Sequence, residues 1–330
     1  MLTPLSTSAK FAPSHISTGH LPDAVSVQQL VDDAHAYFKD NTDGENSQVY
    51  PALARVPSDL FGACVASTRG EIYAAGDTDF EFTIMSVSKP FVFALICELL
   101  GPDEARDKLG ANATGFPFNS LGAIERMFEG RTNPMVNAGA IATTSLVPGK
   151  NAAEKWTFIH DGLSRFAGRS LPLNEEVYAS ATETNFRNRG IANLLKSFGR
   201  IYSDPADATE LYTRQCSLNV SAKDLAVMGA TLADGGVKKR VVDVSVCHYT
   251  LAVMTTAGLY ETSGDWLYEI GLPGKSGIGG GIVAVSPGKG GFGAFAPLLD
   301  AAGNSVKGQL AAKFLSQRLG MDLFVSNAEA

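Results

Sequence analysis

The sequence predicts a mixed α/β fold, in which one antiparallel sheet is built from strands at both ends of the chain and is flanked by helices. Two hairpin patterns, one near each end, and helical spacing of apolar residues through the middle lead to this expectation. We expect a flexible tail over 1–24 and a single domain over 25–325. Its α/β part should cover about 25–90 and 270–320, and an all-helical part about 91–269.

The expected elements follow one another along the chain. Apolar spacing predicts a helix over 25–40, and FGACVAST and EIYAAGD around an Arg-Gly turn predict a hairpin over 61–77. In FTIMSVSKPFVFALICELLG (82–101) a strand passes directly into a buried helix. The segments SRFAG, IANLLKSFGRIY and AKDLAVMGATLADGG are helical in pattern. KSGIGGGIVAVSP and FGAFAPLL predict the second hairpin over 275–299, and VKGQLAAKFLSQRL predicts a final helix over 306–319.

Composition limits the classes of function. The chain has 330 residues, 45% of them hydrophobic and 18% charged, which is typical of a well-packed globular protein. A net charge of -7 and a pI near 5.3 argue against nucleic-acid binding. We find no run of about 18 apolar residues and no signal peptide, so we expect a cytoplasmic protein without a membrane span. The four cysteines and five histidines lack ligand spacing, so we expect no metal.

The junction SVSK places a hydroxyl and an ammonium one helical turn apart. Ser86 and Lys89 are at i and i+3, so they lie on one face of a helix. Free N–H groups and the positive dipole end at the helix start favour an oxyanion beside Ser86. A lysine acts as a base only if its pKa falls from about 10.4 towards ~7–8, which burial among apolar residues produces. The pattern is short, and a catalytic and a structural role remain equally open.

Three other motifs are weaker candidates for a catalytic or binding role. Ser286 and Lys289 repeat the SxxK pattern in a hairpin turn with no helix after it, so we assign them no chemistry. GKGGFG (288–293) matches GxGxxG, but strand residues follow it, so a tight turn is the better interpretation. KSG at 275–277 resembles the element that partners SxxK in penicillin-recognising enzymes, and Ile278 could then supply an oxyanion N–H group.

The apolar stretch NPMVNAGAI (133–141) contains two asparagines. A buried amide is costly unless it is hydrogen-bonded, so each of them either caps structure or binds a ligand. We favour a structural role for Asn133, which precedes a proline, and leave Asn137 open between the two.

Several long strings together resemble one family, the serine-dependent glutaminases of the β-lactamase-like superfamily. They are FTIMSVSKPF, GRTNPMVNAGAIATTSL, the RN of NFRNRGIA, LYTRQCSLNV, TAGLYETSGDW and GLPGKSGIGGGI. The resemblance runs from about Tyr50 to Leu319. It implies hydrolysis of glutamine to glutamate and ammonia, a β-lactamase-like fold, no cofactor and a homo-oligomer, either a dimer or a tetramer.

The resemblance also implies site residues. Ser86 would be the nucleophile, Lys89 its base and Tyr260 the relay of the proton to the leaving ammonia. The backbone N–H groups of Ser86 and Ile278 would form the oxyanion hole. The positions that match those holding the backbone end of glutamine are Tyr50, Asn137, Asn188 and Tyr212.

Two positions depart from the family pattern. Met85 stands where glutamine is common, and Ala181 stands where the family has a glutamate expected to pair with the α-ammonium of the substrate. Glu183 lies two positions further on, and we expect it to compensate as a substrate-binding residue. It can do so only if the segment is extended, because positions two apart do not share a face of a helix.

Two alternative functions stay open. One is a serine amidase of the same fold that acts on another ω-amide, and the other is a glutamine-binding relative without turnover. A penicillin-type hydrolase fits less well, because the asparagine and tyrosine motifs follow the glutaminase pattern. In each case the expected partner is a small molecule, not a nucleic acid or a membrane.

Overall fold

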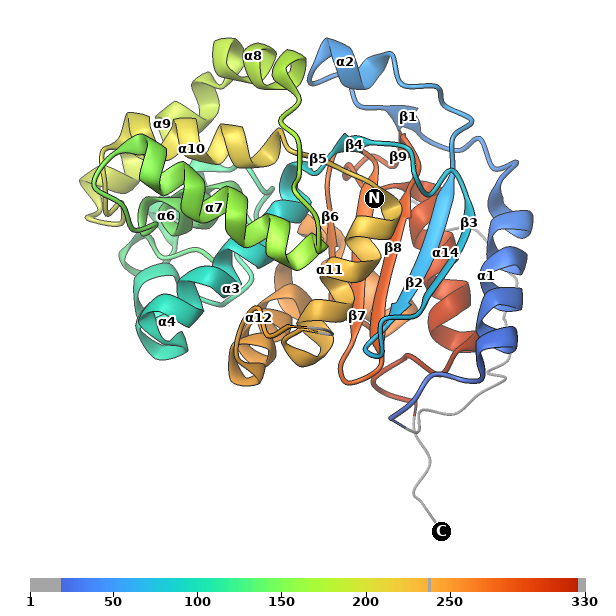
Figure 1. Cartoon of the computed structure of the whole chain (residues 1–330). Helices are drawn as coiled ribbons and strands as arrows, with labels where there is room; N and C mark the ends of the chain where they lie inside the picture. Colours follow the sequence, from blue (N-terminus) through green and yellow to red (C-terminus); the bar gives the residue numbers. More distant parts are fainter. Residues whose placement is uncertain (1–18, 237–238, 326–330) are drawn as a thin grey trace.

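The computed structural model describes residues 19–236 and 239–325. Figure 1 shows helices gathered on one side of the molecule and a sheet with its covering helices on the other. The predicted tail over 1–24 lies mostly outside the described residues, and helix α1 begins at Ala24. None of the helices in the described ranges is both long and apolar enough to cross a bilayer.

The main sheet is antiparallel and joins the two ends of the chain. Its strand order is β3-β2-β8-β7-β6. Their bounds are β2 Gly62–Ser67, β3 Ile72–Gly76, β6 Gly274–Ser276, β7 Gly281–Ser286 and β8 Gly290–Phe295. The two predicted hairpins are therefore neighbours, with β2 paired to β8 in a register that sets Ala63 opposite Ala294. This arrangement confirms the predicted sheet.

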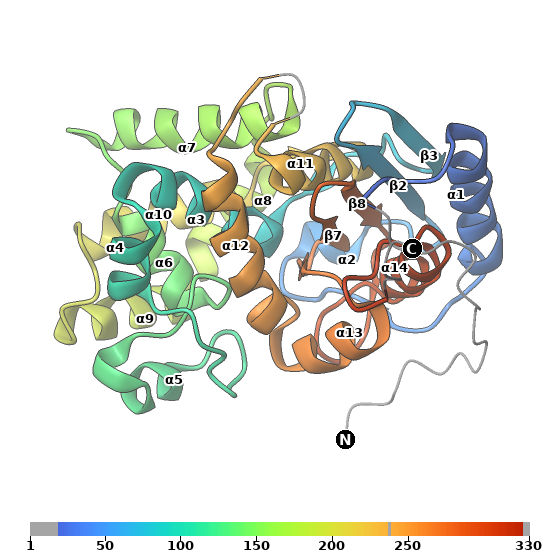
Figure 2. The ribbon, with the colours of Figure 1, turned by 90° about the horizontal axis from the view of Figure 1, so that it is seen from below.

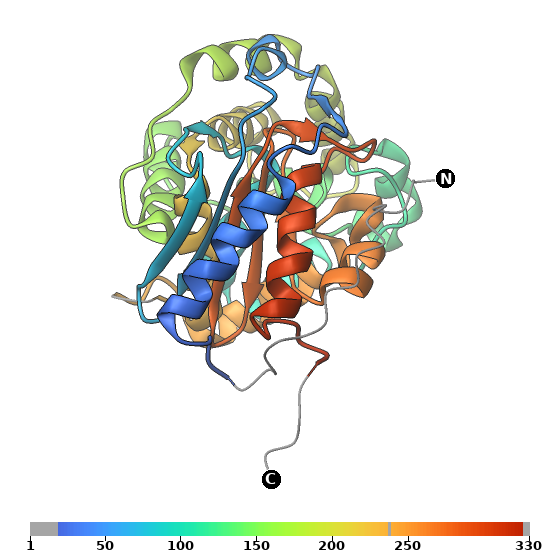
Figure 3. The same ribbon diagram turned by 90° about the vertical axis from the view of Figure 1, so that its right-hand side faces the viewer.

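Helices cover both faces of this sheet. Helices α1 (Ala24–Phe38) and α14 (Val306–Arg318) lie side by side over one face (Figure 3). Helix α11 (Ala222–Asp234) packs on the other face against β8. A Cβ atom added at Gly291 would lie 2.3 Å from the backbone nitrogen of Ala230, so only glycine allows this close approach. Helix α11 falls in the range predicted for the helical part but belongs to the sheet, a contact that helical spacing cannot reveal.

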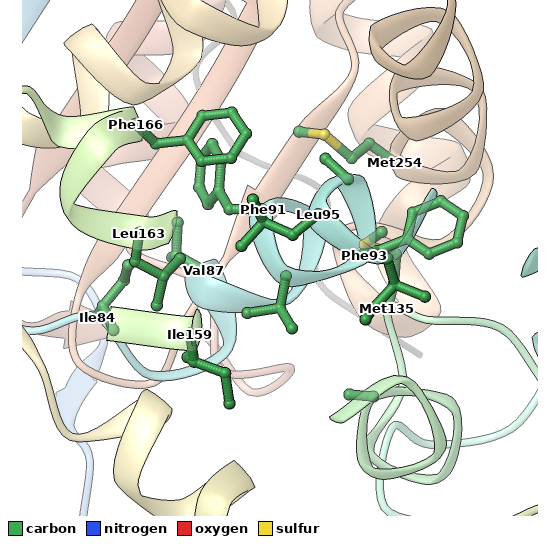
Figure 4. Packing of buried hydrophobic residues seen from close by; sticks show 14 of the residues in the cluster. Ile84, Val87, Phe91, Phe93, Leu95, Met135, Ile159, Leu163, Phe166 and Met254 are labelled. Atoms are coloured by element: carbon green, nitrogen blue, oxygen red, sulfur yellow. The ribbon is translucent and has the colours of Figure 1, made fainter. Parts of the chain in front are cut away.

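The helical part surrounds α3 (Ser88–Leu100), whose residues 88–97 are all buried. A helix that is apolar on every side is expected to lie in a core. Figure 4 shows Phe91, Leu95 and Phe166 packed together in this core. The surrounding helices are α4 Pro102–Leu109, α5 Leu121–Arg126, α6 Asn137–Ser145, α7 Ala152–Ala167, α8 Glu175–Thr184, α9 Phe186–Ser197, α10 Pro205–Cys216 and α12 Val244–Ala257.

Short elements connect the two parts. Figure 2 shows α12 between the helical part and the sheet, with α13 (Ser263–Ile270) beside α14. Two-residue strands form two further pairs, β4 with β5 and β1 with β9. The bounds of the remaining short elements are β1 Glu45–Asn46, α2 Pro51–Ala54, β4 Phe82–Thr83, β5 Asn219–Val220, β9 Leu298–Leu299, and the 3₁₀ turns η1 Met85–Val87, η2 Phe128–Gly130 and η3 Tyr260–Thr262.

Candidate active site

Ser86 lies in the turn η1, where strand β4 passes into helix α3. The preceding residue, Met85, has a φ of 47°, which is rare for a residue other than glycine. Such backbone strain is typical of functional sites, where surrounding packing holds it. Pro90 follows within the first turn of α3, where no intrahelical N–H bond is lost. This local geometry presents Ser86 at the start of a buried helix.

Lys89 is buried and its ammonium group is held by two acceptors. Its Nζ donates to the side-chain oxygen of Asn137 at 2.8 Å and to the backbone oxygen of Met135 at 3.3 Å. Neither acceptor carries a charge that would stabilise an ammonium ion. Burial therefore lowers the pKa of Lys89 to about 7. At neutral pH a large fraction of Lys89 is unprotonated and can accept a proton.

A chain of amides and a phenol extends from Lys89. Asn137, at the first position of α6, accepts the Tyr212 hydroxyl at 3.1 Å and donates its amide to Asn188 at 3.0 Å. Asn133 is buried further away and uses its amide to hold the loop, through Met135 N and Asn112 O. Asn133 thus has the structural contacts expected of it, while Asn137 lies within the polar chain.

Tyr260 lies in the turn η3 with a φ of 59°, a second strained position at the site. Its hydroxyl donates to the backbone oxygen of Ser276 at 3.2 Å and is hydrogen-bonded with Ser86. Burial raises the pKa of Tyr260 to about 12, so its phenol is protonated at neutral pH. The ring of Phe118 packs against it at 4.7 Å between centroids.

Lys275, the lysine of the KSG motif, lies behind Tyr260. Its Nζ donates to the backbone oxygens of Gly258 and Ser276, both at 2.7 Å, and is 4.1 Å from the centre of the Tyr260 ring. Burial and the nearby Lys89 hold the pKa of Lys275 well below its usual value. Lys275 therefore braces the segment that carries Tyr260.

The loop after β6 lies against the backbone of Ser86. A Cβ atom added at Gly277 would be 3.3 Å from the Ser86 nitrogen, which shows how closely the two segments approach. In residues 19–236 and 239–325, no backbone hydrogen bond outside the helices and strands uses the N–H of Ile278. Free N–H groups of this kind, next to a helix start, can stabilise an oxyanion.

These groups surround a cavity of about 270 Å³. Six of the predicted site residues line it: Tyr50, Ser86, Asn137, Asn188, Tyr212 and Ile278. Lys89 and Tyr260 lie directly behind this wall, hydrogen-bonded to Asn137 and Ser86 respectively. A larger cavity of about 870 Å³ lies between α7 and α11 and contains none of the predicted residues.

Glu183 is placed away from the cavity, contrary to our expectation. It lies on α8, where Ala181 is buried at the cavity wall and Glu183 is exposed. In a helix, residues two apart point to nearly opposite sides. Glu183 could replace the family's glutamate only if this segment were extended, and the segment is a helix. Glu183 therefore does not take the place of that glutamate.

The residues of the cavity wall that sequence reasoning missed include Phe118, Arg187 and Cys216. Phe118 is in a loop without periodicity, and its backbone oxygen accepts from Asn137 N at 2.8 Å, a contact that no local pattern reveals. Arg187 is next to the predicted Asn188, and its Nε donates to Asn119 O. The Cys216 thiol has a raised pKa because it is buried.

The second SxxK pair has a different environment. Ser286 donates to Met321 O at 2.9 Å and Lys289 donates to Gly320 O, both in the loop after α14. These contacts fix the β7–β8 turn to the C-terminal segment, and none of these residues lines the cavity. The assignment of no chemistry to this copy agrees with these structural contacts. Among the described residues, no group of three His, Cys, Asp or Glu side chains is placed to hold a metal ion.

The fold and its neighbours define the class of protein as β-lactamase-like. A solved structure described as probable glutaminase ybaS superposes with a TM-score of 0.90 at 45% identity, over 92% of this chain and 99% of that one. The structure of Mglu in its glutamate form superposes with a TM-score of 0.85 at 34% identity, over 91% of this chain and 70% of that one.

Comparison of sequences identifies the family within this structural class. The family model described as Glutaminase matches residues 44–324. "Glutaminase 2" of Yersinia pestis is 71% identical over 94% of this chain and 93% of its own length. "Glutaminase" of Colwellia psychrerythraea is 48% identical over 90% of this chain and 97% of its own length. The chain belongs to the glutaminase family.

Proposed function

We propose that this protein hydrolyses the side-chain amide of glutamine through an acyl-enzyme on Ser86, with Lys89 as base. The reaction, which yields glutamate and ammonia, is the one that family membership gives. The observation that supports the residue roles is a fully buried lysine three positions after a serine at the cavity wall, a burial that lowers the pKa of Lys89 to about 7. No cofactor takes part in the proposed steps.

The first step forms the ester. Lys89 takes the hydroxyl proton of Ser86, and the Ser86 oxygen attacks the carbonyl carbon of the substrate amide. The negative charge that develops on the carbonyl oxygen lies between the N–H groups of Ser86 and Ile278. Such preorganised donors stabilise a tetrahedral intermediate more than the planar amide, which accelerates the step.

The second part releases ammonia and restores the enzyme. Tyr260, hydrogen-bonded with Ser86 and protonated at neutral pH, passes a proton from Lys89 to the departing nitrogen. The C–N bond breaks and leaves an ester on Ser86. Water then attacks this ester with Lys89 again taking a proton, the C–O bond breaks, and the proton returns to the Ser86 oxygen as glutamate leaves.

The polar chain that extends from Lys89 suits the backbone end of the substrate. Asn188 and Tyr50 line the wall with polar side chains, and the Asn137 oxygen accepts from both Tyr212 and Lys89. Amides and phenols donate hydrogen bonds to a carboxylate. We therefore propose that Tyr50 and Asn188 donate to the α-carboxylate of glutamine, and that Asn137 and Tyr212, which are hydrogen-bonded to each other, complete the wall at the backbone end of the substrate.

Trapping the ester tests this assignment of the nucleophile. Enzyme mixed with glutamine and quenched in acid should carry a glutamyl adduct on the peptide that contains Ser86, measured by mass spectrometry. Cys216 is the alternative nucleophile in the same cavity, and burial keeps its thiol protonated. An adduct on Cys216 would contradict the proposal, and Cys216→Ala should leave the Ser86 adduct in place.

Removing the Tyr260 hydroxyl should slow turnover. In Tyr260→Phe we expect kcat to fall by about 10²-fold or more, because general acid–base groups contribute on this order. KM for glutamine should change much less, since the ring still packs on Phe118. Steady-state ammonia release measures both constants. A kcat close to that of the wild type would make Tyr260 a wall of the cavity only.

The same proposal extends to compartment and assembly. The four cysteines are all free, which agrees with the reducing environment of the cytoplasm. We propose a cytoplasmic homo-oligomer, a dimer or tetramer, as the family resemblance implies. Sedimentation of the purified protein measures the assembly directly, and a monomer at micromolar concentration would contradict it.

A further inference from the structure

The charges at the cavity wall are of one sign. Among the described residues that line it, none is an aspartate or a glutamate. The charged side chain that does line it is Arg187, and the buried amine of Lys89 lies behind Asn137. The remaining polar groups of the wall are amides, hydroxyls and a thiol. This inventory favours an anionic group in the substrate and offers no opposite charge to a cationic one.

Three carboxylates on helix α8 or packed against it are hydrogen-bonded, ion-paired or exposed, and none of them lines the cavity. Glu176 forms an exposed ion pair with Arg55. Glu210, on α10, accepts the hydroxyl of Tyr178 at 2.6 Å. Glu183 is exposed, whereas Ala181 presents only a methyl group at the wall. The side of the cavity formed by α8 is thus uncharged.

An amino acid substrate would place two opposite charges in this cavity. Its carboxylate meets donors, as described above. Its α-ammonium would find neutral acceptors in a wall whose charged side chain is the cationic Arg187. A buried ammonium without a carboxylate partner loses the charge-assisted hydrogen bond that would offset its desolvation.

We propose that this site recognises the carboxylate and the ω-amide of its substrate and does not recognise an α-ammonium. The substrate class is then the monoamides of five-carbon dicarboxylic acids, of which glutamine is one member and glutaramate, without the amino group, is another. This inference rests on the proposed function, because it concerns the same cavity and the same nucleophile.

The test compares the two amides with the wild-type enzyme. We expect kcat/KM for glutaramate to be higher than that for glutamine, or at most tenfold lower, in an assay of ammonia release. A preference for glutamine of more than tenfold would overturn the inference while leaving the proposed function intact. Hydrolysis of neither amide would instead contradict the proposed function.

Restoring a charge at the wall gives a second, independent measurement. In Ala181→Glu the ratio of kcat/KM for glutamine to that for glutaramate should rise by about tenfold or more, the effect of one charge-assisted bond. Ala181→Gln has the same size without the charge and should not change the ratio. Ala179→Glu makes the same substitution at an exposed position of α8 and should also leave it unchanged. An equal rise in Ala181→Gln and Ala181→Glu would overturn the charge argument.

Discussion

Ser86→Ala is expected to abolish glutamine hydrolysis, with kcat reduced by more than about 10³-fold, because removal of a nucleophile eliminates the acyl-enzyme route. The protein should remain folded. Ser86 lies in a short turn whose neighbours are apolar, and a methyl group fits where the hydroxymethyl group was. Ammonia release measures the loss, and thermal unfolding measures the retained stability. Activity within tenfold of the wild type would eliminate the acyl-enzyme mechanism.

Ser286→Ala is the matched control for this experiment. It removes the hydroxyl of the other SxxK copy, which is buried and donates to Met321 O. Loss of that bond can reduce stability by about 1 kcal/mol, but kcat per folded molecule should stay near the wild-type value. If Ser286→Ala were inactive and Ser86→Ala active, the assignment based on helix context would be reversed.

Lys89→Arg is expected to be as inactive as Ser86→Ala. Arginine keeps a positive charge but stays protonated at any accessible pH, so it cannot act as a base. Lys89→Met, which has neither the charge nor the base, should be equally inactive. Equal loss in the two variants would show that the positive charge alone does not support activity. The control is Lys307→Arg, another buried lysine, whose Nζ donates to Asp59 O outside the cavity. An active Lys89→Arg enzyme would reduce Lys89 to an electrostatic support.

The pH dependence of the wild type checks the same role. In the proposed mechanism Lys89 acts only when it is unprotonated, and burial lowers its pKa to about 7. We therefore expect kcat/KM to fall about tenfold per pH unit well below 7 and to level off above it. The direction in which kcat/KM changes with pH is decisive, because a lysine that acted as a cation would give the opposite trend. A flat profile between pH 5 and 8 would contradict the assignment.

Local sequence patterns predicted the parts of the site that local structure determines. The strand-to-helix junction at Ser86 follows from hydrophobic pattern, and the spacing to Lys89 follows from the helix repeat. Tyr260 and Asn188 were predicted only from the family resemblance, because neither lies in a local motif that indicates a chemical role. Phe118 could not be predicted, because a contact from an irregular loop depends on tertiary packing.

The error at Glu183 has a physical cause. The side of the chain to which a residue points depends on whether the segment is a helix or a strand, and this segment, although polar, is a helix. The same limitation applies to α11, whose helical pattern was predicted but whose packing partner was not. Its contact with β8 depends on Gly291, where a side chain would meet backbone atoms. Periodicity predicts elements well and their neighbours poorly.

The pairing of β2 with β8 has a consequence for how the enzyme is made. These central strands come from opposite ends of the chain, so a ribosome releases β2 long before its partner exists. Until then β2 exposes an edge open to aggregation. Pairings so distant in sequence also slow folding, because a long loop must close first. Ile278, the proposed oxyanion donor, is synthesised in the same late segment, so activity should appear only after nearly the whole chain has been made.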